Sequence, residues 1–150
     1  MITNAARIFH GAVLGTPEHY AITLVKFYIV DPTARHFDLT ITSAVRSPYQ
    51  QRKLTDAAGN PIPASKKARN VSQHVRGEAI DFSCPDMPAA FQFIDKNIPT
   101  WQLFLYIEEG RPRSIHASIP PRGRTSGAKT QMNVDGTWKL YEGTIPVVRA

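Results

Sequence analysis

The sequence predicts a single domain of the α+β class over residues 1–150, with helices flanking an antiparallel sheet. Two observations support this class. Strand-like alternation occurs both before and after a helical segment, and the later strands are separated by short turn sequences. A chain of 150 residues can bury one core without a metal or a disulfide. A metal site in this chain would therefore serve chemistry more readily than folding.

The first half of the chain predicts one strand, one short helix, one loop and an apolar segment of ambiguous structure. The apolar run "HYAITLVKFYIV", which ends before Pro32, could form a buried helix or a buried strand, because periodicity does not separate the two. "FDLTITSAVRS" alternates, with Leu39 and Ile41 on one side of a half-buried strand. "SPYQQRKLTDAAG" predicts a short helix with Ser47 as N-cap and Gly59 beyond its end, and "NPIPASKKARN" predicts a loop.

The second half of the chain predicts strands that are joined mainly by turns. "EAIDFS" predicts a strand with Ile80 and Phe82 toward the core and Asp81 on the opposite face. "DMPAAFQFIDKNI" predicts a helix. "QLFLYIEE" and "RSIHASI" predict a hairpin that turns at residues 110–112, and the Asp-Gly of "NVDGTWKLY" predicts a second hairpin. Trp101 and Trp138 are interpreted as packing residues.

Composition restricts the partners of the protein. The 18 basic and 12 acidic residues give a net charge of +6, which favours anionic partners, but no RNA-binding or zinc-finger motif accompanies the scattered basic residues. We therefore expect no nucleic-acid partner. The single cysteine, Cys84, excludes an internal disulfide and is interpreted as a small half-buried hydrophobic residue. The N-terminus lacks the apolar run of a secretory signal, so we expect synthesis in the cytoplasm and no membrane insertion.

The segment "SQHVRGEAIDFS" places two metal-binding residue types, His74 and Asp81, on either side of Gly77. Glycine would let the loop turn sharply, so that the imidazole and the carboxylate converge. A hydrolytic zinc ion takes three protein ligands and leaves one position to water. We therefore expect a third ligand on a neighbouring strand, and "RSIHASI" offers His116.

Strand alternation predicts that several polar side chains share the sheet face opposite the core. Pairing of Glu109 with Arg113 across the predicted turn would set the register of the hairpin. His116 would then face Tyr106, with Glu108 diagonally beside it. The residues expected on this face are Arg46, Asp81, Glu108 and His116.

These segments resemble the motifs of the M15 family of zinc peptidases, which comprises D-Ala-D-Ala carboxypeptidases and related phage and bacterial endopeptidases. "SQHVRGEAIDF" is similar to the pattern S-x-H-x-x-G-x-A-x-D, "SAVRS" to S-x-x-R-S, and "IHAS" to the downstream H-x-S strand. The three segments occur in the family's order and span residues 43–118. The resemblance implies a hedgehog/DD-peptidase-like fold.

The resemblance also implies a site. The ligands of its Zn²⁺ ion would be His74, Asp81 and His116. Arg46 would bind a substrate carboxylate or polarise the scissile carbonyl, and Ser72 and Gln73 would line the same pocket. The family's general base, a Glu or His, stands three to five residues before the last histidine, where this chain has Arg, Pro and Arg. The remaining candidates are Glu108, which strand parity favours, and Glu109, which a longer turn would favour.

The function implied is zinc-dependent hydrolysis of an amide bond in a peptidoglycan stem peptide, with zinc-bound water as the nucleophile. The enzyme would be a D,D-carboxypeptidase or an endopeptidase that acts on the bacterial cell wall in phage lysis or as part of a virion, although recycling of wall fragments would also fit. A catalytically inactive M15-like domain that binds wall peptide or a virion partner is the alternative. A basic nucleic-acid-binding protein is a third hypothesis. The sequence does not predict the oligomeric state.

Overall fold

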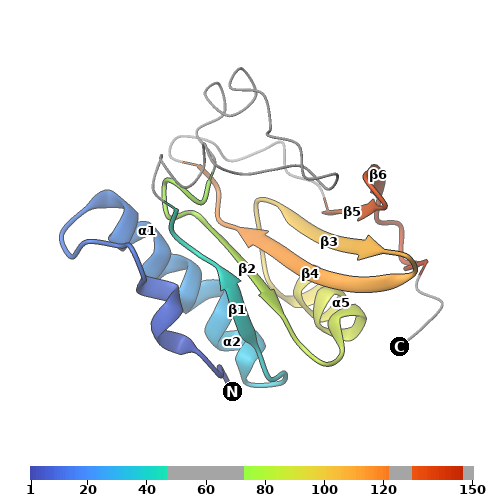
Figure 1. Ribbon diagram of the computed structural model, residues 1–150, viewed down its shortest axis with the longest axis horizontal. Coiled ribbons are helices and arrows are strands. Elements are labelled where there is room, and N and C mark those ends of the chain that lie inside the picture. The colour runs from blue at the N-terminus through green and yellow to red at the C-terminus, as the bar shows by residue number, and fades with distance from the viewer. Residues whose placement is uncertain (47–72, 122–129, 147–150) are drawn as a thin grey trace.

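The computed structural model describes residues 1–46, 73–121 and 130–146 (Figure 1). The helical elements are the 3-10 helix η1 (Ala5–Phe9), α1 (Pro17–Val25), the π-helical turn η2 (Lys26–Val30), α2 (Asp31–Ala34) and α5 (Met87–Asn97). The strands are β1 (Thr40–Ser43), β2 (Ala79–Ser83), β3 (Leu103–Glu108), β4 (Arg111–Ser118), β5 (Thr130–Val134) and β6 (Thr137–Leu140). This combination agrees with the α+β class. The helix predicted from Ser47 to Gly59 and the loop predicted after it lie outside the described residues.

The strands form a six-stranded sheet in the order β1-β2-β4-β3-β5-β6. Neighbouring strands are antiparallel except β3 and β5, which are parallel. The predicted antiparallel sheet is therefore wrong at one pair, and the sheet is mixed. A hairpin cannot join two parallel strands. Here β4 returns the chain to the end of the sheet where β3 begins, and β5 starts from that same end, with Thr130 beside Leu103.

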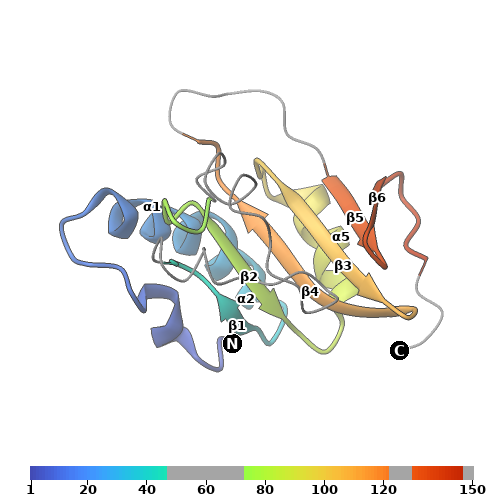
Figure 2. The same cartoon turned by 45° about the horizontal axis from the view of Figure 1, so that its top comes forward.

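The helices cover one face of the sheet (Figures 1 and 2). α5 packs on β3 and β4, and α1 packs on β2. The buried hydrophobic strand residues of the core are Ile41, Ile80, Phe82, Leu103, Leu105, Ile107, Ile115, Ala117 and Met132. The alternation predicted for β2 is confirmed, because Ile80 and Phe82 are fully buried while Asp81 is half-buried. The opposite face of the sheet carries the polar residues discussed below.

The apolar run that the sequence left ambiguous is helical. Its fully buried residues Ile22, Val25 and Ile29 recur with the three- and four-residue spacing of a helix, and Val30 is buried beside Ile29. The helix begins after Thr16, whose side-chain oxygen accepts a hydrogen bond from the backbone N–H of His19, and Pro17 occupies the first helical position. None of the helices in the described ranges has the length and apolar character needed to cross a membrane.

Both predicted hairpins form, but the first has a shorter turn than expected. Glu109 and Gly110 make the turn with positive φ values of 51° and 74°, and β4 already begins at Arg111. In the second hairpin, Asp135 and Gly136 have φ values of 50° and 89°. Two consecutive residues of positive φ are typical of the turn that matches the twist of a two-stranded ribbon.

The register predicted for the β3–β4 hairpin is therefore wrong. Glu108 pairs with Arg111, and the register shifts between Tyr106 and Ile107. His116 consequently pairs with Phe104 and not with Tyr106. Two features cause this. The two-residue turn brings the Arg-Pro-Arg segment into the strand instead of leaving it in the loop, and the register shift between Tyr106 and Ile107 then places His116 opposite Phe104 and not opposite Leu103.

Candidate metal site

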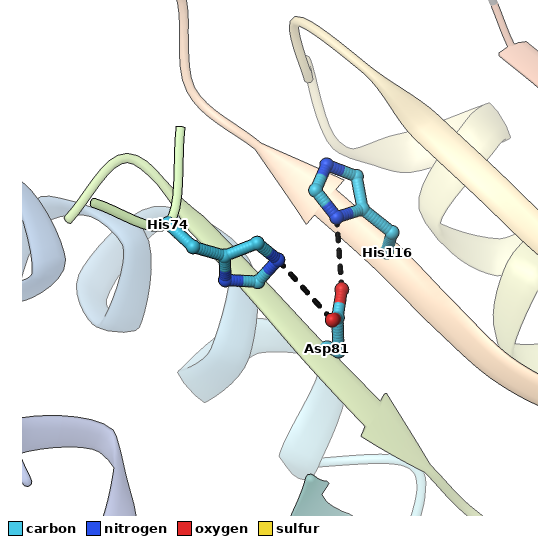
Figure 3. Close-up of side chains that lie close together, drawn as sticks. All are labelled: His74, Asp81 and His116. Carbon is cyan, nitrogen blue, oxygen red and sulfur yellow. Dashed lines mark hydrogen bonds and ion pairs between the residues drawn. The ribbon is translucent and has the colours of Figure 1, made fainter. Parts of the chain in front are cut away.

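Three potential metal ligands converge on the sheet face opposite the helices (Figure 3). His74 lies in the turn before β2, Asp81 lies in β2, and His116 lies in β4. β2 and β4 are neighbours in the sheet, and their register pairs Asp81 directly with His116. One potential ligand atom from each side chain lies within 4.8 Å of the others. The three residues predicted as ligands are thus close enough to bind one metal ion.

The Asp81 carboxylate lies between the two imidazole rings (Figure 3). Nδ1 of His116 is 2.8 Å from Oδ1 of Asp81, and Nε2 of His74 is 3.1 Å from Oδ2. In a tetrahedral site with metal–ligand distances of about 2.0–2.2 Å, neighbouring ligand atoms lie about 3.3 Å apart. Both nitrogen–oxygen distances are close to this value, and one ligand atom from each of the three residues lies within 4.8 Å of the others.

The two histidines determine the charge of Asp81. Burial by itself would raise the pKa of the Asp81 carboxyl. The hydrogen bonds from His116 and His74, together with the electrostatic attraction between the rings and the carboxylate, outweigh burial and hold the pKa well below its ordinary value. The carboxyl group is therefore ionised at physiological pH, which is the form that binds a metal.

The backbone orients the ring of His74. Nδ1 lies 2.8 Å from the carbonyl oxygen of Ala44, so Nδ1 carries a proton and donates it to that oxygen. This hydrogen bond turns Nε2 toward the Asp81 carboxylate. A proton or a metal ion is required between these two atoms, since both are otherwise acceptors. Metal-binding histidines commonly donate their second ring N–H to a carbonyl in this way.

Packing orients the ring of His116. It stacks on Phe104 at a ring-centroid distance of 5.2 Å and an angle of 18°. Nδ1 faces Asp81, whereas Nε2 is buried without a hydrogen-bond partner among the described residues. Nδ1 is therefore the nitrogen that His116 offers to a metal ion.

Gly77 determines the path of the chain between His74 and Asp81. Its φ is +72°, and its N–H donates to the carbonyl oxygen of His74 at 3.2 Å. A Cβ atom at this position would collide with the backbone carbonyl of Glu18 in α1. The glycine predicted to allow a sharp turn is thus required both for the turn and for the approach of the loop to α1.

Gly77→Ala is expected to lower the free energy of unfolding by about 3 kcal/mol. A left-handed conformation costs an L-residue ~1–2 kcal/mol, and overpacking costs a further ~1–3 kcal/mol. Chemical denaturation measures the loss. Gly136→Ala is the matched control, because its φ is also positive but a Cβ atom there meets nothing within 4 Å. Equal losses in the two variants would contradict the close approach to Glu18.

The cluster lines a pocket with a volume of about 300 Å³. The lining residues are Arg46, His74, Asp81, Tyr106, Ser114 and His116. Arg46, predicted on this face, is held by its own hydrogen bonds. Its backbone N–H donates to the carbonyl oxygen of His74 at 3.1 Å, Nε donates to Oγ of Ser43 at 3.1 Å, and Nη2 donates to Oδ2 of Asp81 at 3.3 Å. Burial lowers the pKa of the guanidinium, while the negative charge of Asp81 acts in the opposite direction.

Tyr106 and Ser114 line the pocket although the sequence analysis gave them no role. They pair with each other across β3 and β4, on the face that carries His116. Burial, and after it the negative charge of Asp81, raises the pKa of Tyr106 to about 12, so its hydroxyl stays protonated and can donate a hydrogen bond. Strand alternation already predicts both residues on the face of His116, but it does not show that they line a pocket.

The structure does not bring the two candidate bases to the cluster. Glu108 lies at the far end of the hairpin, where its side chain is 58% exposed and lies 3.5 Å from Nε of Arg113. Glu109 lies in the turn itself. Neither residue lines the pocket. The physical reason is the register of the hairpin, which places Phe104, not an acid, beside His116.

Gln73, which was predicted to line the pocket beside His74, has a different role. Nε2 of Gln73 donates a hydrogen bond to the backbone oxygen of Ile119 at 3.1 Å, and Gln73 is not among the lining residues. Its side chain therefore fastens the turn before β2 to the segment after β4. Ser72 lies outside the described residues.

Cys84 belongs to the hydrophobic core and not to the site. Burial raises the pKa of its thiol to about 11. The thiol is thus protonated at neutral pH and a poor nucleophile. The interpretation of Cys84 as a hydrophobic residue agrees with this environment.

No protein-family model matches the chain, and neither a curated protein nor a solved structure matches it. The likeness to M15 motifs remains a prediction from the sequence.

Proposed function

We propose that the chain is a zinc-dependent hydrolase that cleaves an amide bond in peptidoglycan stem peptides. The observation that carries this proposal is the convergence of His74, Asp81 and His116 beside Arg46 in one pocket. A hydrolytic metal site combines such ligands with an open coordination position. The order of the three M15-like motifs supports a wall peptide as the substrate. The small size and the basic charge of the chain favour a role in phage lysis or in a virion.

The donor set suits zinc. Two imidazole nitrogens and a carboxylate oxygen are ligands that zinc accepts readily, whereas calcium and magnesium prefer oxygen ligands alone. The ion would be held by Nε2 of His74, a carboxylate oxygen of Asp81 and Nδ1 of His116. When bound, zinc supplies Lewis acidity and lowers the pKa of a water molecule at the site.

Arg46 and Tyr106 would stabilise negative charge on the oxygen of the scissile carbonyl. The guanidinium of Arg46 is already fixed by Ser43 and Asp81, so little entropy is lost when it holds the substrate. The phenol of Tyr106 is protonated and lines the same pocket. Preorganised donors of this kind usually make the largest contribution to amide hydrolysis.

A catalytically inactive domain that binds stem peptides is the second candidate. Among the residues that the structure describes, Asp81 is the only carboxylate that lines the pocket, and its oxygens face the two histidines. A general base contributes typically ~10²–10⁴ to the rate. A site without a base could retain the metal and the peptide but would turn over slowly.

Zinc content and amine release, measured on the same preparation, test the proposal. The hydrolase should hold about one zinc ion per chain and release new amino groups from stem pentapeptide or purified peptidoglycan. Chelation should abolish the release, and added zinc should restore it. Binding of the pentapeptide without amine release would favour the inactive domain. Failure to bind zinc, even after dialysis against an excess, would overturn the hydrolase.

A further inference from the structure

Aromatic side chains extend across the sheet from the three candidate metal ligands to the edge strand β6. Phe104 stacks on His116 at a centroid distance of 5.2 Å. Trp138 makes T-shaped contacts with Phe104 at 4.7 Å and with Tyr106 at 5.7 Å. We call Phe104, Tyr106 and Trp138 the aromatic shelf.

Strand register places the candidate ligands Asp81 and His116 and the aromatic shelf on one continuous surface. Residues that pair across neighbouring strands share a face of the sheet. One row of paired residues comprises Asp81, His116, Phe104, Gln131 and Leu140. The next row comprises Ser114, Tyr106, Asn133 and Trp138. A substrate bound at the cluster can therefore extend along these rows to β6.

Trp138 is the exposed end of the aromatic shelf. It is 46% exposed despite its two ring contacts, whereas Trp101 is only 8% exposed. The interpretation as a packing residue therefore fits Trp101 but not Trp138. The helices lie on the other face of the sheet (Figure 2), and all of β6 is exposed. An indole that packs against two rings and remains half-exposed is suited to stack against a ligand.

We propose that the aromatic shelf binds an amino-sugar ring of the peptidoglycan glycan. This inference rests on the proposed function, because it concerns the sugar to which a wall stem peptide is attached. One side of a sugar ring presents C–H bonds that pack on an indole, while its hydroxyl and N-acetyl groups need directional hydrogen bonds. Gln131 and Asn133 present side-chain amides on the same face. Oδ1 of Asn133 accepts a hydrogen bond from the backbone N–H of Gly136 at 2.9 Å, so Asn133 offers its NH2 group as a donor.

The position of the aromatic shelf suits a substrate that is cut some residues away from its sugar. Strands lie about 4.8 Å apart, so β6 is about 14 Å from β4. The ring of Trp138 contacts Phe104 on β3, which shortens this separation. An extended peptide spans about 3.5 Å per residue. The centroid distances from Trp138 to Phe104 and from Phe104 to His116 put the indole at most about 10 Å from the His116 ring, so the scissile amide would lie about three residues from the sugar.

Fluorescence of Trp138 provides the test. In Trp101→Phe, Trp138 is the sole tryptophan, so its emission and its quenching by iodide report directly on the aromatic shelf. The probes are a β-1,4-linked N-acetylglucosamine tetramer and a sugar-free stem pentapeptide, each added to the zinc-loaded protein. The tetramer is expected to shift the emission to the blue and to reduce quenching, whereas the pentapeptide is expected to leave both unchanged.

Calorimetry of the tetramer with variants provides a second measurement. Trp138→Ala is expected to weaken binding about ten-fold or more, because it removes the stacking surface. Gln131→Ala should weaken binding and leave the shelf rings in place. Tyr20→Ala is the matched control, since Tyr20 is also exposed but lies on α1. This control is expected to bind the tetramer as the native protein does.

Three outcomes would overturn the proposal. Protection of Trp138 by the pentapeptide alone would assign the aromatic shelf to a peptide side chain. Protection that rises with protein concentration and needs no ligand would assign it to self-association through β6. Unchanged tetramer binding in both Trp138→Ala and Gln131→Ala would exclude the shelf altogether. These measurements require no turnover, so failure of the sugar site and failure of the hydrolase are distinguishable.

Discussion

His116→Ala is expected to abolish stoichiometric metal binding, because it removes one of the three proposed ligands. The other two, His74 and Asp81, remain in contact with each other but do not complete the site. A ligand present at 1,000 times its dissociation constant stabilises the folded state by about 4 kcal/mol. For a chain of this length that increase corresponds to roughly 10 °C in Tm. In His116→Ala, zinc should therefore cause no increase in Tm. Metal analysis and thermal unfolding with and without zinc measure the two effects.

Two further variants separate loss of a ligand from damage to the fold. His116→Gln keeps a side chain against Phe104 and a donor for the Asp81 carboxylate, so its Tm without metal should stay close to that of the native protein while the zinc response disappears. His36→Ala removes a histidine whose ring contacts Phe93 at 4.8 Å, away from the site. It should retain full zinc binding. If both His116 variants bound as much zinc per chain as the native protein, His116 would not be a ligand.

Strand alternation was sufficient to predict which face of the sheet carries the site. Asp81 lies between the core residues Ile80 and Phe82, and His116 lies between Ile115 and Ala117, so strand parity orients both side chains away from the core. The structure brings them together because β2 and β4 pair in the register that places one directly opposite the other. That strand order cannot be read from local sequence, since β3 separates β4 from β2 along the chain but not in the sheet.

Hairpin register was the part of the site that the sequence predicted wrongly. Gly110 and Pro112 both favour turns, and the sequence does not show which of them ends the strand. In the structure the turn is Glu109–Gly110, and Pro112 is accommodated within β4. A change of this kind alters every cross-strand neighbour. In the observed register Glu108 lies far from His116, and Phe104 pairs with His116 instead. The sequence therefore did not predict the aromatic shelf.

Arg46→Ala is expected to lower amide hydrolysis by the zinc-loaded protein by about 10²–10³-fold, the usual effect of removing one donor from an oxyanion site. Arg46→Lys should recover little of this loss. The guanidinium donates through Nε to Ser43 and through Nη2 to Asp81, and a single ammonium group cannot reproduce this planar arrangement. Both variants should retain zinc, because Arg46 is not a ligand. Arg113→Ala is the matched control, as its exposed side chain pairs only weakly with Glu108.

The kinetic constants of Arg46→Ala would also identify what Arg46 binds. A guanidinium that grips the terminal carboxylate of a substrate contributes equally to the ground state and the transition state, so its loss raises KM and leaves kcat unchanged. A guanidinium that stabilises the developing oxyanion acts in the transition state alone, so its loss lowers kcat and kcat/KM together. The first result would indicate a carboxypeptidase, and amidation of the substrate's terminal carboxylate should then reproduce it in the native protein. The second would indicate that cleavage does not depend on a free terminus, as in an endopeptidase. If kcat and KM of Arg46→Ala equalled those of the native protein, Arg46 would have no role in the reaction.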